Sequence, residues 1–154
     1  MPTLATVAAA AFLNNPGLAE EVFGPYSLLV IASTMDELKA AVGVMPGQLT
    51  ATIIGEDDEL VQYADFIQLV TEKVGRVIIN GVPTGVEVCP SMQHGGPFPA
   101  TTDSRFTSVG TDAIKRFVRP VSFQNFPDAL LPAELRQDNP LGIWRLFNNE
   151  LGKH

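Results

Sequence analysis

The sequence predicts an α/β protein built around an open, mainly parallel sheet with flanking helices. Residues 27–32 form a continuous apolar run, which is typical of a strand covered on both faces. Two further runs of this kind follow before residue 80, and segments with helical spacing of apolar residues separate them. Because strands that alternate with helices are usually joined by parallel crossovers, residues 26–80 are expected to form one small sheet of three strands.

The first predicted helix follows the strand at 27–32. Thr34 and Glu37 have the spacing of a capping box, in which each side chain accepts a hydrogen bond from a free backbone N–H. Apolar residues then recur at helical spacing, at Leu38, Ala41, Val42 and Met45.

A second strand is predicted at 50–54 and a second helix after it. The acidic run at 56–59 favours a helix N-terminus through the macrodipole, and Lys73 with Gly75 indicates the end of that helix. The third strand is predicted at 76–80.

The rest of the chain is expected to be more irregular. Residues 81–107 are rich in Gly and Pro and are read as a long loop, which in compact proteins is usually functional. A short helix is expected within 109–117 and an extended segment at 121–124. The pair Asn139 and Pro140 predicts the start of a last helix, which would bury Leu141, Trp144, Phe147 and Leu151.

Charge and composition exclude several functions. The net charge of −7 and the scattered distribution of only ten Lys and Arg argue against nucleic acid and anionic lipid as partners. The single cysteine, Cys89, cannot form an internal disulfide, so the cytoplasm is the expected compartment. Residues 4–13 are apolar, but they are too few to span a bilayer and lack a positively charged leader, so no membrane contact is expected.

The most specific motif is Glu20-Glu21-Val22-Phe23-Gly24-Pro25. It resembles the E-E-x-F-G-P signature of NAD(P)-dependent aldehyde dehydrogenases. The resemblance implies that Glu21 and Phe23 hold the nicotinamide-side ribose of NAD or NADP. In that family the nucleophilic Cys and the general-base Glu lie upstream of this motif, so the chain is read as a C-terminal part of such an enzyme, with no catalytic residue of its own.

The resemblance extends along the chain. Residues 75–80 resemble the family's G-x-V-x-[IV]-N strand, and His94-Gly95-Gly96 resembles its P-F-G-G turn. The loop at 88–97 and the tail at 126–154 are similar to the branch that oxidises 2-oxoglutarate semialdehyde. In that interpretation Cys89, His94 and Gly95 contact the aldehyde substrate.

The resemblance also implies a domain organisation and partners. Residues 1–118 would form the C-terminal part of the catalytic domain, and residues 119–154 an oligomerisation strand with a helical tail. The implied partners are the aldehyde, the upstream segment of the same enzyme and further copies of the chain in a homo-oligomer. The cofactor would bind only in the complete enzyme.

Two other functions stay open. The chain could be a stand-alone module that only binds or assembles. It could also be a small hydrolase in which His94 activates the Cys89 thiol, although no orienting Asp or Asn can be assigned, which favours an inert cysteine. A metal site is not expected, because Cys89, His94 and His154 do not have zinc-ligand spacing.

Overall fold

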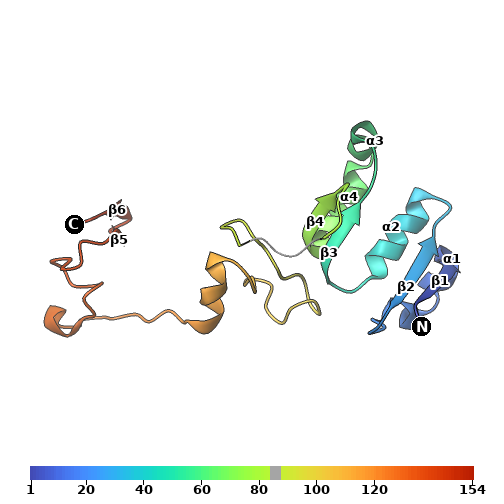
Figure 1. Ribbon diagram of the computed structural model, residues 1–154. Helices are drawn as coiled ribbons and strands as arrows, with labels where there is room; N and C mark the ends of the chain where they lie inside the picture. The colour runs from blue at the N-terminus through green and yellow to red at the C-terminus, as the bar shows by residue number, and fades with distance from the viewer. Residues whose placement is uncertain (84–87) are drawn as a thin grey trace. The chain divides into compact units, whose positions relative to one another are not determined.

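The computed structural model describes residues 1–83 and 88–154, and it divides the chain into two units. The N-terminal unit is Met1–Val118 and the C-terminal unit is Arg119–His154. Figure 1 labels their helices and strands. The roles that the resemblance implies for residues 1–118 and 119–154 stay predictions.

The N-terminal unit begins with a parallel pair of strands, β1 (Thr3–Ala8) and β2 (Tyr26–Ile31). The connection between them contains α1 (Ala9–Leu13) and the 3₁₀ turn η1 (Pro16–Ala19). Ala9 and Phe12 of α1 are buried and belong to the small core. The predicted strand at 27–32 is therefore confirmed. Its partner β1 was not expected, because residues 4–13 were considered as one apolar run and not as a strand followed by a helix.

A second parallel pair consists of β3 (Gln48–Ile53) and β4 (Val74–Ile79), as Figure 1 shows. Between β2 and β3 lies α2 (Met35–Val44), and between β3 and β4 lie α3 (Asp57–Gln62) and α4 (Ala64–Lys73). Helix α2 contacts α1 and also α4, and α4 contacts β4. The helices thus join the two strand pairs within one unit.

The predicted starts of the first two helices are confirmed. At α2 the Glu37 backbone N–H donates to the Thr34 hydroxyl at 3.2 Å, while the Glu37 carboxylate accepts from the Ser33 N–H at 2.7 Å. Helix α3 begins within the acidic run. The expected single helix is interrupted at Tyr63, however, and Gly75 lies inside β4 rather than after a helix. The Lys73 ammonium donates to the carbonyls of Gly43 and Met45, so it caps α2 instead of its own helix.

The α/β class with parallel strands is confirmed, but the single three-stranded sheet is wrong for the described residues. There β2 pairs with β1, β3 pairs with β4, and β2 does not pair with β3. Alternation of strands and helices predicts parallel pairing, but it does not say which strands are neighbours.

The loop prediction is confirmed for the part of residues 81–107 that the structure describes, where no helix or strand occurs; residues 84–87 lie outside the described residues. The next helical segment is the 3₁₀ helix η2 (Thr111–Phe117), and a second short one is η3 (Asp128–Leu130). Residues 121–124 form no strand within the described chain.

The predicted last helix is wrong. Instead, β5 (Arg145–Phe147) and β6 (Glu150–Gly152) form an antiparallel hairpin. Asn148 and Asn149 both have positive φ, at 51° and 66°, which is the geometry of a two-residue hairpin turn and which asparagine tolerates. Asn139 does not cap a helix. Its side chain forms hydrogen bonds with the backbone of Ile143 and with the carbonyl of Lys153, and so links the two segments.

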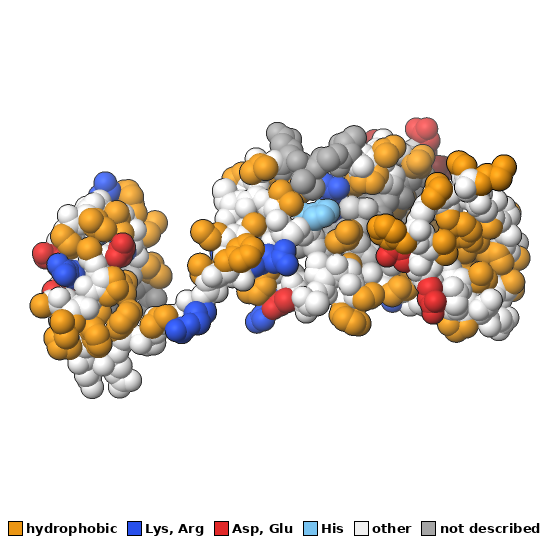
Figure 2. All heavy atoms as spheres, turned by 60° about the horizontal axis from the view of Figure 1, so that its bottom comes forward, with side chains coloured by type: hydrophobic (Ala, Val, Ile, Leu, Met, Phe, Trp, Pro, Cys, Tyr) orange, Lys and Arg blue, Asp and Glu red, His pale blue; other side chains and the backbone are white. Residues whose placement is uncertain are grey.

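Few apolar side chains in the described residues are buried, and many are exposed. Hydrophobic side chains cover much of the face displayed in Figure 2. On the outer face of the first strand pair, Leu29 and Ile31 are 50% and 52% exposed. Among the described residues, no helix has the length and hydrophobicity needed to cross a bilayer.

Candidate functional site

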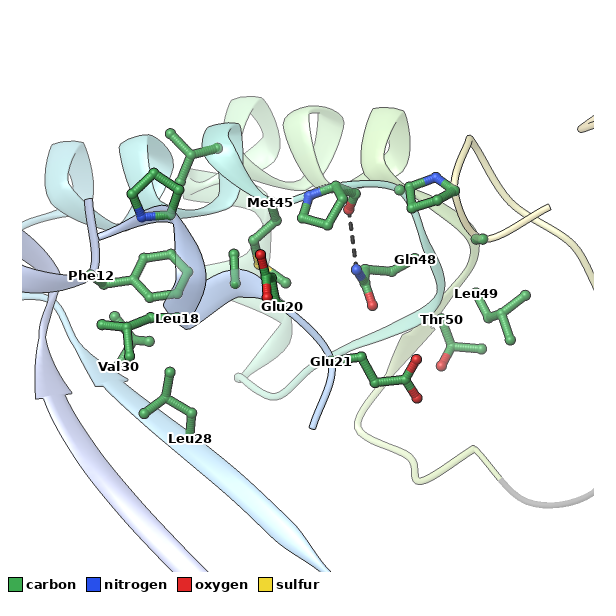
Figure 3. Close-up of a pocket in the computed structure, with 17 residues that line it drawn as sticks. Phe12, Leu18, Glu20, Glu21, Leu28, Val30, Met45, Gln48, Leu49 and Thr50 are labelled. Carbon is green, nitrogen blue, oxygen red and sulfur yellow. Dashed lines mark hydrogen bonds between the residues drawn. The ribbon is translucent and has the colours of Figure 1, made fainter. Parts of the chain in front are cut away.

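Two hollows in the described part of the N-terminal unit contain residues that the sequence singled out. The first hollow, of about 1010 Å³, is lined by η1, β2, the end of α2 and the start of β3, together with Pro99 and Ala100. Figure 3 shows an apolar end with Phe12, Leu18, Leu28 and Val30, and a more polar end with Glu20, Glu21, Gln48 and Thr50. A hollow with one apolar end and a few polar groups is typical of a small-molecule site.

Glu21 lies in this first hollow, and in Figure 3 its side chain extends towards the β3 side, where Thr50 lies. Glu21 follows η1 and precedes β2 in a segment without regular structure. That segment is fixed at its end, because Gly24 has a φ of 155° and the Pro25 carbonyl accepts from the Thr3 N–H at 2.9 Å. The glycine is needed here because other residues rarely adopt this φ.

Phe23 does not line the first hollow in this chain. Its side chain is 97% exposed, although it lies only two residues from Glu21. The ring is therefore free to contact a ligand or another polypeptide, while the described residues offer it no packing surface.

The second hollow, of about 540 Å³, shares Leu49 and Ala100 with the first, so the two hollows are neighbours. The residues of the loop and of η2 that line the second hollow are His94, Thr101, Thr102, Asp103, Phe106, Ser108 and Arg116. The motif residue Glu21 and the loop residue His94, 73 positions apart in the sequence, are thereby placed in adjacent hollows.

His94 is held by its backbone. Its N–H donates to the hydroxyl of the buried Thr107 at 2.9 Å, and its carbonyl accepts from both the N–H and the hydroxyl of Ser108, each at 2.9 Å. The Thr107 hydroxyl in turn donates to the Val109 carbonyl. This network fixes the loop where it borders the second hollow.

Gly95 and Gly96 are buried and line neither hollow. They pack on the starts of β4 and β3. A Cβ placed on Gly75 would lie 1.8 Å from the Gly95 carbonyl oxygen, and one placed on Gly96 would lie 2.3 Å from the Gln48 carbonyl oxygen. Gly95 therefore has a packing contact in this chain, and its predicted contact with substrate stays a prediction.

Cys89 lies in the same loop but lines neither hollow. Its sulfur is 3.5 Å from the Ser91 hydroxyl, and the described part of the chain contains no hydrogen bond between Cys89 and His94. The hydrolase interpretation thus gains no geometric support among the described residues.

Two charged residues, Asp103 and Arg116, line the second hollow. Arg105 binds the Asp103 carboxylate through two nitrogens, at 2.9 and 2.6 Å. This bidentate pair lowers the pKa of Asp103 to about 2, so the carboxylate stays charged and paired at ordinary pH. Arg116 of η2 is the other charged residue that lines the hollow.

Sequence reasoning did not identify Asp103, Arg116 or Asn80 as important. Asn80 has a φ of 51° and exchanges hydrogen bonds with the Gly55 backbone at 3.0 and 2.8 Å, which closes the ends of β3 and β4. Asn80 is the last residue of the motif at 75–80. The one signal for its role in the sequence is its residue type, since asparagine adopts positive φ more readily than most residues.

Comparisons with known proteins identify relatives. No protein-family model matches the chain. It is 53% identical over 138 residues to the alpha-ketoglutaric semialdehyde dehydrogenase of Acinetobacter baylyi. This chain is related to part of an aldehyde dehydrogenase. It is also 49% identical over 140 residues to the alpha-ketoglutaric semialdehyde dehydrogenase 2 of Azospirillum brasilense.

The matches cover 90% and 91% of this chain but only 26% and 27% of the two dehydrogenases. The chain therefore spans about a quarter of the length of the curated relatives it matches. The predicted resemblance to the semialdehyde branch of the aldehyde dehydrogenases is confirmed. Both relatives are named for that activity. Each of these whole proteins is about four times as long as the region that matches this chain.

Proposed function

We propose that this chain is the cofactor-side and substrate-side wall of an NAD(P)-dependent dehydrogenase that oxidises 2-oxoglutarate semialdehyde to a carboxylate. The observation that supports the proposal is the adjacency of the two hollows, with Glu21 in one and His94 in the other. A dehydrogenase needs a dinucleotide and an aldehyde side by side, because hydride passes directly between them.

The first hollow fits the nicotinamide end of the cofactor. The Glu21 carboxylate can accept hydrogen bonds from both hydroxyls of a ribose, and the apolar end of the hollow suits a flat ring. Phe23, which is exposed and lies two residues after Glu21, can pack on the sugar or the nicotinamide. When bound, the cofactor would accept hydride from the substrate; the chain's own residues position it.

The second hollow fits the aldehyde. His94 lines it, and hydrogen bonds with Thr107 and Ser108 fix the backbone N–H and carbonyl of His94. The nucleophile and the base that the resemblance implies would come from a polypeptide outside residues 1–154. In this proposal the chain orients two reactants and supplies no group that reacts.

The first prediction concerns activity. The 154-residue chain alone is expected to show no NAD(P)-dependent oxidation of an aldehyde, because holding a ribose without the nucleophile cannot accelerate hydride transfer. The measurement is the absorbance of NAD(P)H formed with 2-oxoglutarate semialdehyde as substrate. Turnover by the chain alone would contradict the proposal that the reacting groups lie outside residues 1–154.

The matched test replaces the homologous region of the Acinetobacter baylyi dehydrogenase by this chain. The chimera is expected to oxidise the semialdehyde with NAD or NADP. A chimera that folds to the parent's oligomeric state but has no activity with either cofactor would refute the proposed function.

The second prediction uses the same chimera. Glu21→Gln removes a charged hydrogen-bond acceptor and is expected to raise the cofactor KM about tenfold, while the aldehyde KM changes little. Glu20→Gln, a neighbouring carboxylate in the same hollow, is the control and is expected to have a smaller effect. Equal cofactor KM values for the parent chimera and Glu21→Gln would show that the motif does not act on the cofactor.

A further inference from the structure

Arg116 differs from the other cations of the N-terminal unit in its surroundings. Lys39, Arg105 and Lys115 form ion pairs with Asp65, Asp103 and Asp112. Lys73 donates to two carbonyls, and Arg76 contacts the Met92 sulfur. Among the described residues, Arg116 has no hydrogen bond or ion pair, and it lines the second hollow.

The other charge in this hollow is already compensated. Asp103 is held bidentately by Arg105, so the pair contributes little net charge to the hollow. Arg116 then leaves the second hollow with an excess positive charge, in a chain whose net charge is −7. A local cation in an acidic protein favours an anionic ligand at that place.

Hydroxyl groups complete the hollow. Thr101, Thr102 and Ser108 line it beside His94. The Thr101 hydroxyl donates to the Gly96 carbonyl at 2.7 Å and the Ser108 hydroxyl to the His94 carbonyl at 2.9 Å, so both side chains are positioned by the loop. Each of these hydroxyls has one proton and donates it to a carbonyl. Among the described residues, the lining hydroxyl and guanidinium groups that can still donate to a carboxylate are therefore the Arg116 guanidinium and the Thr102 hydroxyl.

We propose that Arg116 binds the carboxylate of the aldehyde substrate in the second hollow, and that it thereby selects aldehydes with an acidic group at the far end of the molecule. This inference rests on the proposed function. A semialdehyde of a dicarboxylic acid has an aldehyde at one end and a carboxylate at the other, so one ion pair can orient the whole molecule.

Binding to the chain itself tests the site without any catalysis. Glutarate, titrated into the ¹⁵N-labelled 154-residue chain, is expected to shift the amide signals of Thr102, Ser108 and Arg116 saturably. Arg116→Gln is expected to abolish the shifts, and Arg119→Gln, which removes the same charge outside the hollow, to preserve them. Shifts that persist in Arg116→Gln, or no shifts in the folded chain, would overturn the proposal.

Inorganic phosphate distinguishes the carboxylate from anions in general. At equal concentration it is expected to produce weaker shifts than glutarate at the same residues. Equal or stronger shifts with phosphate would make the second hollow a general anion site and would overturn its assignment to the substrate carboxylate.

Kinetics in the chimera tests specificity separately. Arg116→Gln is expected to lower kcat/KM about 100-fold for glutarate semialdehyde, since a charge-assisted bidentate contact is lost, but to leave kcat/KM for pentanal within about twofold. Arg116→Lys should restore part of the activity on the acidic aldehyde. An equal loss for both aldehydes would indicate a structural role and overturn the proposal. A parent chimera inactive on both aldehydes would refute the proposed function, while the binding test would still decide the role of Arg116.

Discussion

Gly75→Ala is expected to lower the free energy of unfolding of the N-terminal unit by about 3 kcal/mol or more, since overpacking that only backbone movement can relieve is at the costly end of such changes. The added Cβ would lie 1.8 Å from the Gly95 carbonyl oxygen and 2.5 Å from its carbon. These are backbone atoms, so no side-chain rotation can relieve the overlap. Either β4 or the loop that carries His94 must move.

The control is Gly43→Ala in α2, where a Cβ would meet nothing within 4 Å. This change should raise the free energy of unfolding by about 0.5–1 kcal/mol, because alanine loses less backbone entropy than glycine in a helix. Urea unfolding of both variants at one protein concentration measures the difference. If Gly75→Ala unfolded at the same urea concentration as the unchanged chain, the close contact between β4 and the loop would not exist.

Self-association is the second large effect expected. The accessible surface of the chain is 11449 Å², whereas two separate compact bodies of the sizes of its two units would together expose only roughly 9,000 Å². Many large apolar side chains of the chain are exposed. Parallel strands normally have both faces covered, yet Leu29 and Ile31 on the outer face of β2 are half exposed.

We therefore expect the isolated chain to form a dimer or a larger assembly, with residues 121–126 in contact between copies. Val121→Asp should shift the sedimentation profile towards the monomer, because it places a charge in that contact. Val61→Asp on α3, where the valine is also exposed, is the control and should shift it less. A compact 16.6 kDa species at micromolar concentration for the unchanged chain would contradict the prediction.

The candidate site was predictable where one short motif carries it. Glu21 was identified from the six residues around it, and it lies in the larger hollow. Arg116 and Asp103 were not identified, because a charged residue in a sequence is usually solvated, and its importance depends on whether a partner compensates its charge. Asp103 has Arg105 two residues away. That Asp103 lines a hollow next to the one with Glu21 is seen only in the structure, where Leu49 and Ala100 line both hollows.

Features that depend on neighbouring residues could be predicted from the amino-acid sequence. These are the strands β2, β3 and β4, the start of α2 at Thr34, the long loop, and the family resemblance. The β5–β6 hairpin also has a local signal, the pair Asn148-Asn149, which outweighs the helical spacing of the apolar residues around it.

The pairing of the strands and the residues that line each hollow follow from contacts between distant parts of the chain. The pairing of β1 with β2 and the contact of Gly75 with Gly95 join residues far apart in the chain. Such contacts depend on how surfaces fit together after the local elements have formed. A pattern of apolar residues predicts that one face of an element is buried. It does not identify the element that covers this face, because the hydrophobic effect is non-directional and many apolar surfaces could cover it.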